Sequence, residues 1–171
     1  MIKLIGAIML IGAAGILGFS ASTTLSLRER TLSGFLRCLR TMHSEIGEYL
    51  TPLEEIMQRL SLETTAPLNM FFETCLSEIR EKPEIPFRLI WTKNIKKADY
   101  LKLKKEETET IAALGGVLGR YGSEEQKKAI EHTARCLESM AIAAEREKKR
   151  LGGLYTRLGV ISGLALVIVF I

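Results

Sequence analysis

The sequence predicts an all-α protein in which a helical bundle is flanked by N- and C-terminal transmembrane helices. Charged residues make up 26 % of the 171 residues and gather in the middle of the chain. Apolar residues in that middle part recur at spacings of three and four, which is typical of amphipathic helices. No stretch alternates polar and apolar residues long enough to indicate a strand. We therefore expect a transmembrane helix over 1–27, a cytoplasmic helical bundle over 28–150 and a second transmembrane helix over 151–171.

The first 27 residues contain one charged side chain, Lys3. About 20 apolar residues are enough for a helix to cross a bilayer. A cleaved N-terminal signal is the alternative, because small residues at 18–20 follow the apolar run. Basic residues such as Arg28 and Arg30 come directly after the segment. Since basic residues resist translocation, this charge asymmetry favours an uncleaved anchor with its downstream side in the cytoplasm.

The charge-free stretch 158–171 at the other end of the chain is short for a membrane span. As a helix it would measure about 21 Å, against about 30 Å of hydrocarbon. The span is therefore expected to begin near Leu151 and to include Arg157, whose long side chain can reach the headgroups. The basic run at 146–150 precedes it. Both termini are thus expected outside, and the middle of the chain inside.

Small residues four positions apart predict close packing between the two spans. Ala14 and Gly18 form such a pair in the first span, and Gly159 and Gly163 form one in the second. This spacing lets the backbones of membrane helices approach closely. Composition alone is the alternative explanation, because the motif is common by chance.

The middle of the chain reads as a series of amphipathic helices. The first has an apolar face from Leu32 to Leu50 and is expected to continue directly from the first span. A third apolar helical face covers 68–79 and ends at the prolines of EKPEIP. Helical spacing continues from Ile90 to Leu118. The stretch 124–149 has neither glycine nor proline, which predicts one long helix that runs into the second span.

The segment TPLEE after the first helix predicts the start of a second. Thr51 can cap the new helix, and Pro52 suits its first position because a proline lacks the amide that would be unpaired there. Glu54 would complete a capping box with Thr51.

The glycine-rich segment GVLGRYGSEEQ, residues 116–126, could be a phosphate loop or a turn between two helices. A phosphate loop requires a Gly-Lys pair, which is absent from this segment. The two glutamates of the segment would also repel phosphate. Ser123 followed three residues later by Gln126 predicts a capping box instead. Gly119 or Gly122 can adopt the left-handed conformation that ends a helix. We therefore interpret the segment as a turn.

The sequence lacks the residue patterns of an enzyme or a metal site. Cys38, Cys75 and Cys136 have no metal-ligand spacing and are expected to be small buried hydrophobes in a reducing compartment. The two histidines, His43 and His132, stand apart from other ligands or nucleophiles. The excess of 24 basic over 20 acidic residues is too mild for a nucleic-acid surface. We expect no catalysis, cofactor, metal or nucleic acid, and a role in protein binding.

Several stretches resemble one protein family along essentially the whole chain. LRCLRTMHSEI, followed by TPL, is similar to the first helices of the stage III sporulation protein AB family. LKLKKEETETIAALGGVLG and the following Gln126 resemble its central L-G-x-x-L-G region. KKRLGGLYTRLGVISGLALVIVFI resembles its closing membrane segment.

The resemblance implies a role in endospore formation, in the mother-cell (outer forespore) membrane. It implies a non-enzymatic platform subunit of a channel complex that resembles secretion machinery, in contact with other membrane subunits and the lipid bilayer. The helical domain would be similar to those of the F-type platform protein of type II secretion and would dock a cytoplasmic secretion-type ATPase. The alternative is an exported single-span helical interaction protein. On this resemblance, the candidate docking residues are charged residues at helix ends and turns: Glu45, Glu48, Arg120, Glu124 and Glu125.

Overall fold

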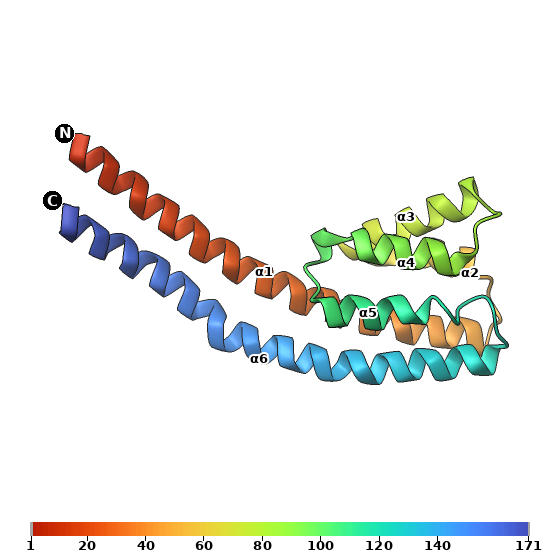
Figure 1. The fold of residues 1–171 in the computed structure, drawn as a ribbon. Helices are drawn as coiled ribbons and strands as arrows, with labels where there is room; N and C mark the ends of the chain where they lie inside the picture. The colour runs from red at the N-terminus through yellow and green to blue at the C-terminus, as the bar shows by residue number, and fades with distance from the viewer. Residues whose placement is uncertain (1, 171) are drawn as a thin grey trace. The chain divides into compact units, whose positions relative to one another are not determined.

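The computed structural model describes the backbone of residues 2–170 and the side chains of residues 20–151 (Figure 1). Its described residues form helices and loops without a strand, which confirms the all-α prediction. The elements in chain order are α1 (Ile2–Gly47), α2 (Leu53–Glu63), α3 (Leu68–Glu81), α4 (Phe87–Lys97), the short 3-10 helix η1 (Asp99–Leu101), α5 (Lys105–Leu114) and α6 (Ser123–Phe170).

The helices belong to two compact units. The paired-helix unit consists of α1 up to Glu29 and α6 from Ile142 onward. The bundle unit comprises Arg30–Ala141 and therefore holds α2 to α5 together with the remaining parts of α1 and α6.

Two ion pairs of opposite polarity join the helices of the paired-helix unit. Arg28 of α1 donates to Glu147 of α6 at 2.6 Å, and Lys148 of α6 donates to Glu29 of α1 at 3.3 Å. The Arg28 side chain is largely buried. A shift of one helix along the other would place like charges opposite each other, so the two pairs define the register of the helices at this point.

Among the residues whose side chains are described, no helical stretch is long and apolar enough to cross a membrane. The predicted spans 1–27 and 151–171 lie mostly outside these residues. The proposed packing residues of those spans lie wholly outside them: Ala14, Gly18, Gly159 and Gly163.

The core of the bundle unit is built around one aromatic cluster. Phe71 contacts Trp91 edge to face at a centroid distance of 5.0 Å and also contacts Phe72 and Phe35 at 5.2 and 5.7 Å. All four rings are buried. The Trp91 indole N–H donates to the carbonyl of Ile111 at 2.8 Å, so its one polar group is satisfied in the interior. The cluster thereby ties α1, α3, α4 and α5 together.

Several local predictions of the sequence are wrong. The apolar face of α1 ends with the helix at Gly47, and Leu50 is 70 % exposed. Thr51 does not cap α2, because its hydroxyl donates to Glu45 instead, and the Glu54 carboxylate accepts from Arg80. Cys136 is only partly buried.

The apolar stretch from Ile90 to Leu118 is divided between α4, η1 and α5. The division occurs without glycine or proline, and Lys102 adopts a left-handed conformation with φ 54°. The buried carboxylate of Glu107 accepts the backbone amide of Lys104 at 2.7 Å and so stabilises the start of α5. Leu101 is fully buried and anchors η1 in the core.

The close approach of Gly115 to Trp91 provides a test of the core. A Cβ atom at Gly115 would lie 2.4 Å from Cδ1 of the Trp91 ring. Because the ring is fully enclosed, we expect Gly115→Ala to lower the free energy of unfolding by about 1–3 kcal/mol. Urea denaturation followed by the fluorescence of Trp91, the one tryptophan in the chain, measures this change.

Gly122→Ala is the matched control for that substitution. Its Cβ would meet only the end of the flexible Glu125 side chain. We expect its unfolding free energy to stay within about 0.5 kcal/mol of the parent. Equal effects of the two substitutions would show that the contact at Trp91 does not limit the packing.

The three thiols are expected to react unequally. Burial raises the pKa of Cys38 and of Cys75 to about 12 from 9.0. N-ethylmaleimide near neutral pH should therefore label Cys136 in the native chain, and the other two thiols only after unfolding.

The same burial makes the stability of the protein depend on pH. Because unfolded thiols ionise near pH 9 and the buried ones near pH 12, the free energy of unfolding should fall as the pH rises between these values. The expected fall is about 1.4 kcal/mol for each thiol and each pH unit. Rapid native labelling of all three thiols would contradict this burial.

Candidate docking surface

Two turns at one end of the bundle unit form the candidate site. The α1–α2 turn (48–52) and the α5–α6 turn (115–122) lie side by side there (Figure 1). Between them is a hollow of about 250 Å³, lined by Ile46, Leu50, Thr51, Pro52, Leu53, Gly119, Ser123 and Gln126. We call the two turns, with the first turn of α6, the loop surface.

Large apolar side chains project from the loop surface into solvent. Tyr49 is 69 % exposed, Leu50 70 % and Tyr121 49 %. Leu50 also adopts a left-handed backbone conformation with φ 53°. This conformation costs a residue with a Cβ roughly 1–2 kcal/mol. A leucine that is both strained and exposed indicates a position shaped for contact with another molecule rather than for the core.

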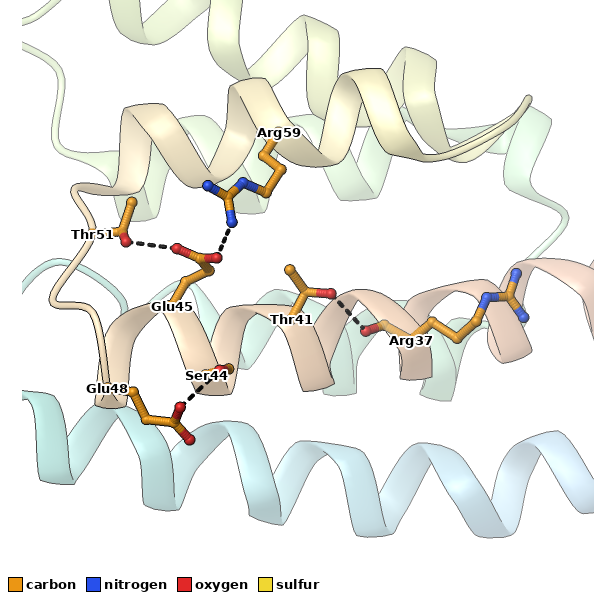
Figure 2. A network of polar contacts seen from close by, with 7 residues as sticks. All are labelled: Arg37, Thr41, Ser44, Glu45, Glu48, Thr51 and Arg59. Atoms are coloured by element: carbon orange, nitrogen blue, oxygen red, sulfur yellow. Dashed lines mark hydrogen bonds and ion pairs between the residues drawn. The ribbon is translucent and has the colours of Figure 1, made fainter.

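A buried carboxylate holds the first turn in place (Figure 2). Glu45 lies in the last turn of α1 and is 6 % exposed. Its carboxylate accepts hydrogen bonds from the Arg59 guanidinium and, at 2.6 Å, from the Thr51 hydroxyl. The Thr51 amide also donates to the Glu45 carbonyl at 2.9 Å. Because Thr51 is bound through both its side chain and its backbone, the turn that carries Leu50 is fixed between α1 and α2.

Gln126 holds the second turn. Its side-chain oxygen accepts the amide of Gly119 at 3.0 Å, and its side-chain nitrogen donates to the carbonyl of Tyr121 at 2.7 Å. The predicted capping box with Ser123 is therefore wrong, since the glutamine bonds the preceding turn. Gly119 adopts the predicted left-handed conformation, with φ 72°, but it does not end a helix as predicted, because α5 already ends at Leu114. The segment is thus a turn fixed by one amide side chain.

Four of the five predicted docking residues are exposed on the loop surface. Glu48 accepts from Ser44 at 3.3 Å, Glu124 pairs with Lys127 at 3.0 Å, and the Arg120 guanidinium lies 5.4 Å from the centre of the Tyr121 ring. Glu125 is also exposed. Glu45, in contrast, is buried and supports the turn from inside.

Tyr49, Leu50 and Tyr121 were not predicted as part of this site. Leu50 continues the apolar spacing of α1 and was assigned to its inner face. The available signal was Pro52, because helices usually end at or before the residue that precedes a proline.

Within residues 20–151, no group of three or more His, Cys, Asp or Glu side chains is placed to bind a metal ion.

Comparison with known proteins identifies the family. The stage III sporulation protein AB family is matched over residues 3–171. The chain belongs to this family. Stage III sporulation protein AB of Bacillus subtilis (strain 168) is 27 % identical over 169 residues, which cover 98 % of each chain. A solved structure of a stage III sporulation protein AB superimposes with a TM-score of 0.67 at 26 % identity, covering 72 % of this chain and 98 % of that one.

Family membership confirms the resemblance that the sequence motifs indicated and assigns the chain a role in sporulation. The solved relative supports the helical fold at an identity similar to that of the curated relative.

Removal of the Glu45 carboxylate should loosen the first turn. Glu45→Ala leaves Thr51 and Arg59 without their acceptor, and we expect a loss of about 1–3 kcal/mol in unfolding free energy. Arg59 is half exposed and can turn to water, so the loss should stay below that of a fully buried pair. Amide hydrogen exchange at 48–52 should also accelerate. Glu48→Ala, which removes an exposed carboxylate nearby, should change neither measurement appreciably.

Proposed function

We propose that this chain is a non-enzymatic membrane platform subunit of a channel complex between mother cell and forespore. Its bundle unit docks a cytoplasmic secretion-type ATPase through the loop surface. The observation that carries the proposal is the group of Tyr49, Leu50 and Tyr121, exposed on two turns that are each fixed by buried or bridging polar side chains.

The composition of the loop surface suits a protein partner. Tyrosine is enriched among residues that dominate binding energy, since it combines a large apolar area with a hydroxyl. Charged residues of both signs surround the apolar group: Glu48, Arg120, Glu124 and Glu125. An apolar centre with a charged rim is the usual arrangement of protein interfaces. Fixed turns also lower the entropy lost on binding.

The proposal places the two terminal segments, 1–27 and 151–171, in the mother-cell (outer forespore) membrane. The basic residues that follow the first segment and precede the second keep the bundle unit in the cytoplasm. The small residues in these segments would contact each other or other membrane subunits of the complex.

Retention of the ATPase by the full chain tests the docking surface. Purified full chain in detergent would be immobilised and incubated with the purified secretion-type ATPase of the sporulation channel. We expect the combined substitutions Tyr49→Ser, Leu50→Asn and Tyr121→Ser to reduce retention at least about tenfold, because apolar anchors at an interface centre dominate affinity. Asparagine tolerates the left-handed conformation at position 50 and so preserves the turn.

Met70→Ser is the control, because Met70 is a comparably exposed apolar residue on α3, outside the loop surface. Charge reversal at Glu48, Arg120, Glu124 and Glu125 should weaken retention less and in a salt-dependent manner. The docking proposal is wrong if the apolar variant retains as much ATPase as the Met70 variant.

The side of the membrane on which the loop surface lies distinguishes a platform subunit from an exported protein. Leu50→Cys in a Cys136→Ser background presents one exposed thiol on the loop surface, since the other two cysteines are buried. In intact sporulating cells we expect a membrane-impermeant maleimide to label it only after permeabilisation. Labelling before permeabilisation, together with a mature N-terminus near Ala21, would favour the exported alternative.

A further inference from the structure

The connection between α4 and α5 carries a dense group of positive charges. The ten residues KKADYLKLKK, 96–105, contain five lysines and one acidic residue, Asp99, so their net charge is +4. We call residues 96–105 the lysine segment. The bundle unit as a whole is neutral, because its 17 basic and 17 acidic side chains cancel. All the lysines of the segment are exposed: Lys96, Lys97, Lys102, Lys104 and Lys105.

Little of this charge is neutralised by the start of α5. Glu107 is buried, and its carboxylate accepts the backbone amide of Lys104. Glu109 lies 3.9 Å from Lys105, whose side chain is 90 % exposed, and such a pair is weak. Glu106 is exposed beside the segment. Lys96, Lys97 and Lys102 have no hydrogen bond or ion pair among the residues whose side chains are described.

The lysine segment lies at the end of the bundle unit opposite the loop surface (Figure 1). Lys93 of α4 pairs with Glu78 of α3 at 2.7 Å. One position further along α4, Asn94 meets an earlier residue of α3, Cys75. Helix α4 is therefore antiparallel to α3, and its last residues return toward the start of α3, beside Gly34 of α1. Gly34 stands about one turn after the point where α1 enters the bundle unit.

This end of the bundle unit joins the proposed membrane segments. Helix α1 is continuous from Ile2 to Gly47. Arg30, the first residue of the bundle unit, stands three positions after the segment 1–27, which is about 4.5 Å of helix. Lipid headgroups extend about 5–7 Å beyond the hydrocarbon. Because the Debye length is about 8 Å, positive charges at this end act on the headgroups with little screening.

The fold holds the lysine segment in a defined conformation. Leu101 is fully buried and anchors the middle of the segment in the core. Tyr100 and Leu103 are half-buried between the lysines. Tyrosine is common at the surface of a bilayer, because its ring is apolar and its hydroxyl is polar. The segment therefore combines cations with residues that suit the membrane interface.

The loop surface has the opposite sign. It carries Arg120 against Glu48, Glu124 and Glu125, a net charge of −2. The bundle unit thus has one positive and one negative end. An anionic bilayer attracts the first and repels the second, so the same charge distribution keeps the loop surface directed away from the membrane.

We propose that the lysine segment binds the headgroups of anionic phospholipids. The inference rests on the membrane placement of 1–27 and 151–171 given under the proposed function, and it adds the class of lipid that the bundle unit recognises. Lysine binds phosphate oxygens as a point charge, and clusters of lysine next to a membrane segment attract anionic lipids. A protein partner would have to enter between the bundle unit and the bilayer, so the position of the segment favours lipid.

The reactivity of the lysines themselves tests the contact. The full chain would be reconstituted in lipid nanodiscs of phosphatidylcholine, or of an equal mixture with phosphatidylglycerol, and acetylated with a water-soluble ester. Mass spectrometry gives the rate at each lysine. We expect phosphatidylglycerol to slow acetylation of the lysine segment at least about threefold and about 1 M salt to remove this effect. Lys82 and Lys128, which are exposed outside the segment, should react at unchanged rates. Equal rates in both discs at the segment overturn the inference.

Neutralisation of the segment provides a second test. Glu106→Cys in a Cys136→Ser background carries a fluorophore beside the segment, and a quencher is attached to the lipid headgroups. Phosphatidylglycerol should increase the quenching, and Lys97→Gln with Lys102→Asn should at least halve that increase, because two of the attracting charges are removed. Asparagine tolerates the left-handed conformation at position 102.

Lys82→Gln with Lys128→Gln is the matched control and should keep the full increase in quenching. The emission of the buried Trp91 shows whether each variant is folded. An equal effect of the two pairs of substitutions would mean that general charge, rather than the lysine segment, responds to the lipid, and it overturns the inference.

Flotation with vesicles separates this inference from the membrane placement. The full chain should float with vesicles of either composition, because the terminal segments hold it. A chain that floats with neither refutes the membrane placement and the lipid contact together. A chain that floats with both, while its lysine segment reacts equally in both discs, overturns the lipid contact alone. Protection of the segment by the purified ATPase and not by phosphatidylglycerol would assign it to an acidic protein surface instead.

Discussion

The loop surface depends on the burial of one negative charge. A buried carboxylate requires hydrogen-bond or ion-pair partners, because an unpaired buried charge is strongly destabilising. At Glu45 these partners come from the following turn and helix, Thr51 and Arg59. The hydrogen bonds that compensate for the burial of the carboxylate therefore also set the path of the chain between α1 and α2. The left-handed conformation of Leu50 is maintained because both sides of the turn are held.

The aromatic core has a comparable role for the rest of the bundle unit. Trp91 lies among rings of α1 and α3 and reaches the backbone of α5 through its indole N–H. Gly115 follows directly after α5, where any side chain would collide with that ring. The chain can therefore turn toward α6 close to the core. The second turn of the loop surface starts from this point and is held at its far end by Gln126.

Much of this architecture was predictable from the sequence, because periodic apolar residues and prolines act locally. Helix α3 and the long α6 follow from such patterns. Thr51 was assigned to the wrong partner because a cap and a long-range acceptor have the same local pattern, and the position of Arg59 decides between them. The break between α4 and α5 was missed for a similar reason, since Leu101 and Glu107 stabilise it through burial rather than through glycine or proline. Tyr49 and Leu50 look like core residues until the end of α1 is known.

The ion pairs of the paired-helix unit join residues that are made far apart in time. Arg28 and Glu147 are separated by 119 positions. At a synthesis rate of about 5–20 residues per second, the pair cannot form until roughly 6–25 s after Arg28 has been added. All residues of the bundle unit, Arg30–Ala141, are synthesised within that interval. The pairing of α1 with α6 is therefore a late step in the biosynthesis of each molecule. Chaperones or neighbouring subunits can bind α1 before α6 is available to it.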